Sequence, residues 1–382
     1  MAVQEISVEG HVAKGFERVR DQFAANFERS EPYRDVGASL AVYRHGENVV
    51  DLWGGWRDAA RSQPWTRDTL VNVYSTTKGI VAAALAVAVD RGFLRYEDRV
   101  AQHWPEFAAE GKDRITVSQL ISHQGGLSGF AAPTALEDLY DWASACARLA
   151  AQAPAWSPGE ATSYHACTYG FLAGEVFRRA VGQTLGQFIA SEIASPLACD
   201  IFLGLPESQD HRVAPMIAPA VQPDLAALNI PPVALMAMAN PMIRPEDSDT
   251  VAWKRAELPA MNMYGTADGI ARVFAVLANG GELEGKRLLS EAAVHRMCEV
   301  QSSRPDMLLG LPIAWAQGLA LNSTGALGPN PRAFGHTGWG GSFVFADPDS
   351  GIGAAYTLNR MGADLVGDPR GVDLCRAIAA CG

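Results

Sequence analysis

The chain has 382 residues, of which 48% are hydrophobic and 19% are charged, a balance that excludes an intrinsically disordered protein. Its formal net charge of −11 argues against a nucleic acid or an anionic membrane surface as the main partner. The longest apolar run, from Gly79 to Val89, is too short to span a bilayer.

The sequence carries few signals that would indicate a cellular compartment or a bound cofactor. The N-terminus lacks a basic patch followed by an apolar stretch, so we expect no secretory signal. The six scattered cysteines form no C-x-x-C pair, which is typical of reduced thiols in a cytoplasmic protein. The sequence also lacks a metal-binding histidine pattern, a Walker A lysine and a G-x-G-x-x-G turn. We therefore expect neither a metal nor an organic cofactor.

The first elements predict an α/β domain. Apolar residues at spacings of three and four predict a helix over residues 10–29. Two β-like runs follow, Ala38–Tyr43 and Asn48–Trp53, and the turn between them contains Gly46, which indicates a hairpin. A helix followed by a hairpin favours a sheet with a helix on one face.

The S-x-x-K sequence Ser75-Thr-Thr-Lys78 is the sharpest feature of the chain. It lies between a β-like stretch, Leu70–Tyr74, and an apolar helix predicted over residues 75–92. Ser75 would lie at the positive N-terminal end of this helix, and Lys78, three residues on, could reach its hydroxyl. Burial would disfavour the charge of Lys78 and make its amine a feasible base. The alternative is that Ser75 only caps the helix and Lys78 lies on the surface.

Further helices are predicted over residues 116–123, 135–151, 168–181 and 184–194. The stretch Leu120–Leu127 indicates a helix end with a glycine turn at the rim of a cleft. Tyr164 precedes a helix that begins near Cys167, where its hydroxyl could point into the cleft and shuttle a proton. The alternative is a core aromatic residue. His165, beside it, could serve packing or tune the tyrosine.

Residues 206–245 contain eight prolines and four methionines, which predict a long ordered loop that packs on the body and lines a pocket. The stretch from Phe334 to Ser342 is dense in glycine, which indicates close approach by another part of the backbone. An edge strand there could complete an oxyanion hole, whereas the alternative is a glycine-rich bulge.

The end of the chain matches its beginning. Gly341–Ala346 and Ile352–Leu358 are strand-like runs, and Gly371–Ala380 is predicted to be a closing helix. We therefore expect one discontinuous α/β domain from residues 1–70 and 260–382, and a mostly helical domain from residues 71–259.

In this order the motifs resemble the serine β-lactamase and penicillin-binding-protein superfamily, and most closely its class C β-lactamase-like esterases, the family VIII carboxylesterases. Four segments carry the resemblance: Ser75-x-x-Lys78, Leu120–Leu127, Tyr164 after Trp156-Ser-Pro-Gly159, and His336-Thr-Gly338. The resemblance implies an α/β (α+β) fold in which an antiparallel sheet is flanked by N- and C-terminal helices. A mostly helical insertion would complete it, with the active site between the two regions.

The resemblance also implies roles. Ser75 would be the acylated nucleophile, and Lys78 and Tyr164 would share the proton transfers, with the primary base left open. The backbone N–H groups of Ser75 and Trp339 would form the oxyanion hole. The substrate pocket would include four residues: His336, Gly338, Trp339 and Gln124.

Two positions depart from the pattern of the class C β-lactamases. Ala166 stands where those enzymes carry asparagine, and His336 stands where they carry lysine. A neutral histidine binds a substrate carboxylate poorly, so both changes favour neutral acyl esters over β-lactams and D-Ala-D-Ala peptides.

The sequence thus predicts a cytoplasmic serine carboxylesterase that hydrolyses short-chain esters through a Ser75 acyl-enzyme. We expect a small-molecule ester as substrate and neither nucleic acid nor membrane as partner, and the oligomeric state stays open. The alternatives on the same fold are a β-lactamase, a D-amino-acid peptidase or amidase, and an acyltransferase. A catalytically silent penicillin-binding-like scaffold is the non-enzyme alternative, against which the intact Ser75, Lys78 and Tyr164 argue.

Overall fold

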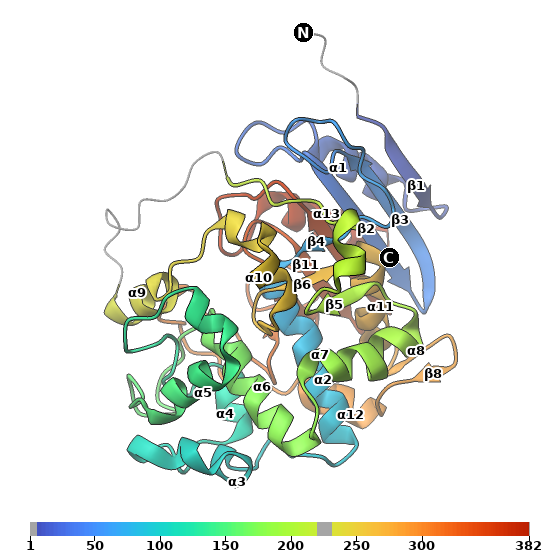
Figure 1. Ribbon diagram of the computed structural model, residues 1–382. Helices are drawn as coiled ribbons and strands as arrows, with labels where there is room; N and C mark the ends of the chain where they lie inside the picture. Colours follow the sequence, from blue (N-terminus) through green and yellow to red (C-terminus); the bar gives the residue numbers. More distant parts are fainter. Residues whose placement is uncertain (1–5, 220–230, 382) are drawn as a thin grey trace.

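A computed structural model describes residues 6–219 and 231–381 of the chain. Within these residues the main sheet has seven strands, and every neighbouring pair is antiparallel. The blue N-terminal strands β1, β2 and β3 lie together at one side of it (Figure 1). Strands from both ends of the chain therefore form one sheet. In spatial order they are β1 (Val8–Val12), β3 (Glu47–Gly55), β2 (Gly37–Arg44), β12 (Ile352–Leu358), β11 (Phe343–Asp347), β10 (Phe334–Thr337) and β9 (Ala320–Leu321).

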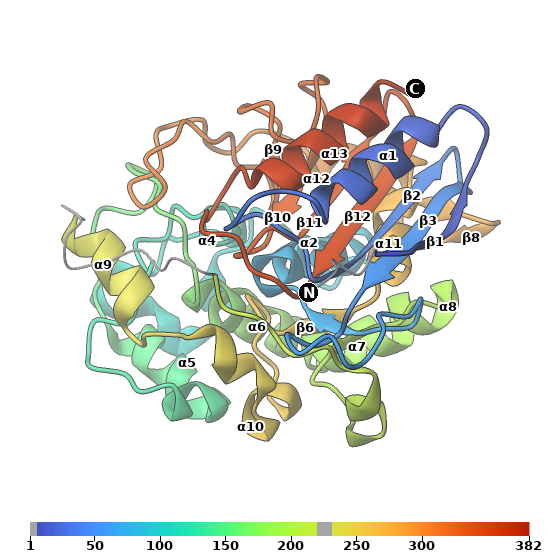
Figure 2. The same cartoon turned by 90° about the horizontal axis from the view of Figure 1, so that it is seen from above.

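Helices cover both faces of this sheet. Helices α1 (Glu17–Asn26) and α13 (Pro369–Ala379) lie side by side over one face, as Figure 2 shows, and α11 (Ala267–Ala278) packs on the other. Side chains alternate along β11: Phe343 and Phe345 enter the core under α1 and α13, whereas Val344 enters the core of the opposite face. The approach of α11 is close at Gly353, where a Cβ would lie 2.3 Å from a backbone nitrogen of the helix.

The predicted hairpin, the two C-terminal strands and the closing helix are confirmed by β2, β3, β11, β12 and α13. The helix predicted over residues 10–29 is wrong at its start. Residues 8–12 form strand β1, which pairs with β3, and helix α1 begins only at Glu17. This pairing is a contact between distant parts of the chain, which local apolar spacing does not report.

The middle of the chain is mostly helical, and the helices predicted there are confirmed at α2, α4, α5, α6 and α7. A three-stranded sheet, β4 (Val71–Asn72), β6 (Met263–Gly265) and β5 (Ile201–Leu203), leads into helix α2. The short strands β7 (Glu282–Leu283) and β8 (Lys286–Arg287) form a separate pair. The other helices are α2 (Thr77–Asp90), α3 (Val100–His103), α4 (Val117–Ile121), α5 (Trp142–Ala151), α6 (Thr168–Val181), α7 (Leu185–Phe188), α8 (Ser195–Leu197), α10 (Val251–Arg255) and α12 (Glu291–Met297).

The loop predicted over residues 206–245 contains a helix, α9 (Pro232–Ala239), so that prediction is wrong for this part. The two prolines at its start occupy positions where a helix needs no N–H donor, and the residues that follow carry no proline. Residues 220–230 of the predicted loop lie outside the described residues. Across the described ranges, every helix falls short of the length and apolar character that crossing a membrane requires.

Candidate active site

Ser75 lies in a short 3-10 turn, Tyr74–Thr76, that joins strand β4 to helix α2. The turn begins with Tyr74 at φ +43°, a conformation that is strained for a residue with a side chain. The Tyr74 hydroxyl donates to the carbonyl oxygen of Pro245, 3.2 Å away, which fixes this residue from the other side of the site. Ser75 follows at once and lines a cavity of about 1030 Å³.

Lys78 is directed at Ser75, as the S-x-x-K spacing predicts. Its Nζ lies 3.1 Å from Ser75 Oγ and 2.8 and 2.9 Å from the carbonyl oxygens of Ala166 and Ala260. The side chain is fully buried, and burial lowers the pKa of Lys78 to about 7. A neutral amine has two N–H groups for the two carbonyls and one lone pair left for the Ser75 hydroxyl. The surroundings of Lys78 therefore suit the uptake of a proton from Ser75.

Tyr164 lies beside Lys78, with its ring centre 4.7 Å from Nζ, and it lines the cavity. Burial raises the pKa of Tyr164 above its usual range, although the nearby Ser75 hydroxyl opposes the shift. Tyr164 is therefore a neutral phenol in the free protein. Among the described residues its hydroxyl has no hydrogen-bond partner. It is thus placed to give and take a proton beside Lys78.

Asp306 holds Tyr164 in place, and no motif in the sequence points to this aspartate. The buried carboxylate accepts hydrogen bonds from the backbone N–H groups of Tyr164, Leu308 and Leu309, each at 3.0 Å, and from the indole N–H of Trp315 at 3.3 Å. The Trp315 ring in turn stacks on the Tyr164 ring, with centroids 5.7 Å apart and planes 10° from parallel. One loop residue thus fixes both the backbone and the ring of Tyr164.

The end of strand β10 lies close against the Ser75 turn. Gly338 permits this, because a Cβ there would lie only 2.3 Å from the carbonyl oxygen of Val73. The Ser342 hydroxyl donates to the same carbonyl at 3.0 Å and lies 2.9 Å from the hydroxyl of Thr76. Two segments far apart in the sequence are therefore joined directly beside Ser75.

Trp339 follows Gly338, and its ring packs edge-on against Tyr74 at a centroid distance of 5.2 Å. Within residues 6–219 and 231–381 no hydrogen bond is found from the backbone N–H of Trp339 or of Ser75. Both residues line the cavity. Two free donors are what the oxyanion of a tetrahedral intermediate requires.

His336 also lines the cavity, at the point where β10 is no longer paired with β9. Its Nδ1 donates to the carbonyl oxygen of Thr337 at 2.8 Å, which leaves Nε2 as an acceptor. Burial, with the nearby Lys78, lowers the pKa of His336 to about 3. His336 therefore offers the cavity a neutral ring and no positive charge.

Three sequence-predicted positions lie elsewhere than expected or are used differently. Gln124 does not line the cavity: its amide nitrogen donates to Ser122 Oγ and to the carbonyl oxygen of Gln301. Gly338 contributes close packing rather than cavity wall. His165 donates from Nδ1 to the carbonyl oxygen of Ser163 at 2.7 Å and accepts from the backbone N–H of Leu127 at 3.3 Å, and burial lowers its pKa to about 4. These contacts favour packing over tuning for His165.

The cavity has a volume of about 1030 Å³ and a largely apolar wall. Its apolar residues come from the Met/Pro-rich segment, from the loop that carries Asp306 and from the C-terminal region, and include Met238, Met242, Ile243, Leu309, Ile313 and Val366. Charged residues that line it are Arg244, Glu246 and Asp364. In the part of the chain that the structure describes, no group of three or more His, Cys, Asp or Glu side chains could hold a metal ion.

Comparison with known proteins identifies the family to which the chain belongs. The family model for Beta-lactamase matches residues 23–374. The chain is 36% identical over 344 residues to the Esterase/beta-lactamase LipL of Mycobacterium tuberculosis, which covers 86% of this chain and 78% of that protein.

Two crystal structures are similar over nearly the whole chain. A family VIII carboxylesterase has 45% sequence identity and a TM-score of 0.93, covering 98% of this chain and 100% of that one. A penicillin-binding protein homolog from Caulobacter crescentus has 40% identity and a TM-score of 0.92, with the same coverage. The chain therefore belongs to the beta-lactamase family and is a serine hydrolase of the β-lactamase fold.

Proposed function

We propose that the protein is a carboxylesterase that hydrolyses neutral carboxylic esters through an acyl-enzyme on Ser75. The observation that carries this proposal is the pair formed by Ser75 and Lys78. A fully buried amine lies 3.1 Å from the hydroxyl, and its pKa is lowered to about 7. An amine that is partly neutral near pH 7 can activate a serine hydroxyl.

Acylation follows from these positions. Ser75 Oγ attacks the ester carbonyl carbon while its proton passes to the neutral amine of Lys78. The carbonyl oxygen gains the electron pair of the broken π bond and accepts hydrogen bonds from the N–H groups of Ser75 and Trp339. The intermediate then collapses: the bond to the alcohol oxygen breaks, and this oxygen takes the proton from Lys78 through the Tyr164 hydroxyl. Because the pKa of Tyr164 is raised, we assign the primary base to Lys78.

Deacylation repeats these steps with water. A water molecule attacks the acyl carbon and gives its proton to Lys78. The bond to Ser75 Oγ breaks, the serine oxygen recovers a proton, and the free acid leaves. The chain is regenerated without a net change in protonation.

The preference for neutral esters rests on His336 and on the cavity wall. The lowered pKa of His336 keeps it uncharged, and Lys78 is engaged by two carbonyls. A substrate carboxylate beside the β10 edge would therefore meet no free positive charge there. The 45% sequence identity to a family VIII carboxylesterase supports the same activity.

Hydrolysis of p-nitrophenyl butyrate tests the proposal. We expect turnover by the wild type and by Ser191→Ala, a control at an exposed serine, and none by Ser75→Ala. A chromogenic cephalosporin measured in parallel should be cleaved far more slowly than the ester. Equal ester turnover by wild type and Ser75→Ala would contradict the nucleophile, and faster cleavage of the cephalosporin would contradict the ester preference.

A further inference from the structure

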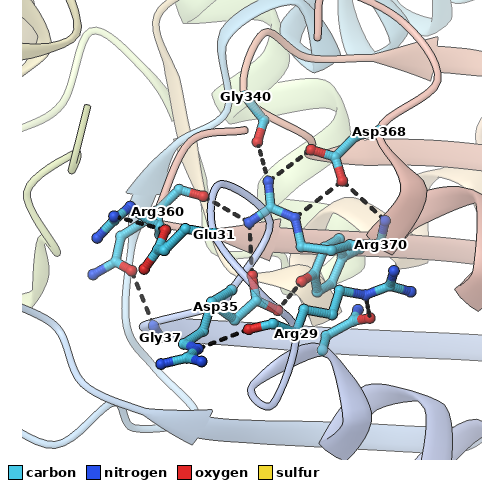
Figure 3. Close-up of polar contacts among 12 residues, drawn as sticks. Arg29, Glu31, Asp35, Gly37, Gly340, Arg360, Asp368 and Arg370 are labelled. Carbon is cyan, nitrogen blue, oxygen red and sulfur yellow. Dashed lines mark hydrogen bonds and ion pairs between the residues drawn. The ribbon is translucent and has the colours of Figure 1, made fainter. Parts of the chain in front are cut away.

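A buried charge cluster lies directly behind the turn that carries Trp339. Arg370, near the start of helix α13, is fully buried, and so is Asp35 (Figure 3). We propose that Arg370 is a positioning residue for the oxyanion hole, because it fixes the direction of the Trp339 N–H through the backbone of Gly340 and Gly341. The inference rests on the proposed function, in which that N–H binds the oxyanion.

Every N–H group of the Arg370 guanidinium has an acceptor. Nε and one N–H of Nη2 donate to the two carboxylate oxygens of Asp368, at 3.0 and 2.7 Å. Nη1 donates to Asp35 at 2.9 Å and to the carbonyl oxygen of Arg360 at 2.8 Å. The remaining N–H of Nη2 donates to the carbonyl oxygen of Gly340, also at 2.8 Å. Two carboxylates thus orient a planar fork toward the Trp339 turn.

Two peptide planes carry this orientation to Trp339. In a trans peptide the C=O and N–H groups point in opposite directions. Because Arg370 holds the Gly340 oxygen, the Gly341 N–H in the same plane points the other way, to the carbonyl oxygen of Gly338 at 3.0 Å. That bond fixes the next plane, whose N–H belongs to Trp339. The Trp339 N–H therefore points out of the turn, away from Gly341.

The turn needs such an anchor because of its own composition. Gly340 and Gly341 have φ angles of +93° and +117°, and glycine populates many other conformations about as readily. A Cβ on Gly341 would lie 2.7 Å from an Asp368 oxygen and 2.9 Å from Arg370 Nη2, so the cluster packs tightly against the turn. The Gly340 oxygen has one further donor, the backbone N–H of Gly362 at 2.9 Å. Loss of the Arg370 contact therefore removes one of its two anchors and loosens the peptide planes that direct the Trp339 N–H.

The experiment compares Arg370→Lys with the wild type. Lysine keeps the positive charge between the two carboxylates but cannot span Asp35, Asp368 and Gly340 together. We expect kcat on p-nitrophenyl butyrate to fall about 10- to 100-fold, with KM changed less than about twofold, since the lost contact acts on the transition state. The affinity for butylboronic acid, which forms a tetrahedral adduct with the serine, should fall by the same factor.

Two variants separate this effect from loss of stability. Glu175→Gln removes the charge of a buried carboxylate far from the Trp339 turn, which accepts from Arg178 and Arg179. It should lower the melting temperature and leave kcat unchanged. Asp368→Asn disturbs the same Nη2 group more mildly, so it should lower kcat and boronate affinity in the same direction as Arg370→Lys. It decides the question if Arg370→Lys does not fold.

Folded Arg370→Lys and Asp368→Asn proteins with wild-type kcat and boronate affinity would overturn the inference. An equal loss of kcat in Glu175→Gln would overturn it too, because the effect would then be general. If the wild type does not hydrolyse esters, the proposed function fails, yet the boronate affinities still test the role of Arg370.

Discussion

At the scale of single residues, the protonation state of Lys78 sets the pH range in which the site can work. Its pKa is lowered to about 7 by burial, so the neutral form gains population as the pH rises through that value. We expect kcat/KM for p-nitrophenyl butyrate to rise from about pH 6 to about pH 8 and then level off. A profile that is flat across this range would contradict Lys78 as the base.

Replacement of this lysine gives the matching loss. We expect Lys78→Met to lower kcat/KM by about 100- to 10,000-fold, the range of general base catalysis. Lys112→Met is the matched control, because Lys112 is also buried and also donates to two backbone carbonyls, far from the cavity wall. Equal losses of kcat/KM in both variants would indicate misfolding rather than loss of the base. Circular dichroism spectra of each variant check whether it is folded.

Tyr164→Phe isolates the phenolic hydroxyl, because phenylalanine keeps the ring that stacks on Trp315. We expect kcat to fall by about 100-fold or more and KM to stay near its wild-type value, as for the loss of a proton shuttle. Tyr96→Phe is the control: it also removes a buried hydroxyl that has no hydrogen-bond partner among the residues the structure describes, away from the cavity. An unchanged kcat in Tyr164→Phe would show that the hydroxyl takes no part in the proton transfer.

Site residues whose partners lie nearby in the sequence can be predicted from it, whereas residues whose partners lie far along the chain cannot. The pair Ser75 and Lys78 is a local contact across one helical turn, so its spacing predicts it. Asp306 and Arg370 reach their partners across loops and from opposite ends of the chain. A lone aspartate or arginine has no periodicity that could reveal such a contact. Gln124 shows the reverse error, since a motif position alone does not say which way a side chain points.

At the scale of elements, the loop around Asp306 determines how rigidly Tyr164 is held. In Asp306→Asn one carboxylate oxygen becomes an NH₂ donor, which faces either the backbone N–H groups or the Trp315 indole N–H. We expect the free energy of unfolding in urea to fall by about 1–3 kcal/mol. The kcat should fall as well, because Trp315 would no longer be fixed against Tyr164. Asp113→Asn, at an exposed aspartate, should change neither quantity, and an Asp306→Asn protein with wild-type kcat would contradict the positioning role.

At the scale of the whole molecule, the fold class follows from the sequence because hairpins and helices at both chain ends are locally visible. The edges of the sheet are not: β1 is defined by its pairing with β3, which lies much later in the chain, and β9 has only two residues. The site forms where the end of β10 meets the turn before α2, a junction that no single motif contains. The domain boundaries near residues 70 and 260 stay a prediction.

The cavity sets the size of substrate that the whole molecule can accept. The family resemblance implies short-chain esters, but an apolar cavity of about 1030 Å³ can bury a longer chain. Each buried methylene is worth about 0.8 kcal/mol, or roughly a fourfold gain in binding. We therefore expect kcat/KM to rise from p-nitrophenyl acetate through the butyrate to the octanoate. Leu309→Trp, which fills part of the wall, should reduce turnover of the octanoate while sparing the acetate. If kcat/KM of the wild type falls for esters longer than the butyrate, the acyl group does not enter this space, and short esters are the preferred substrates.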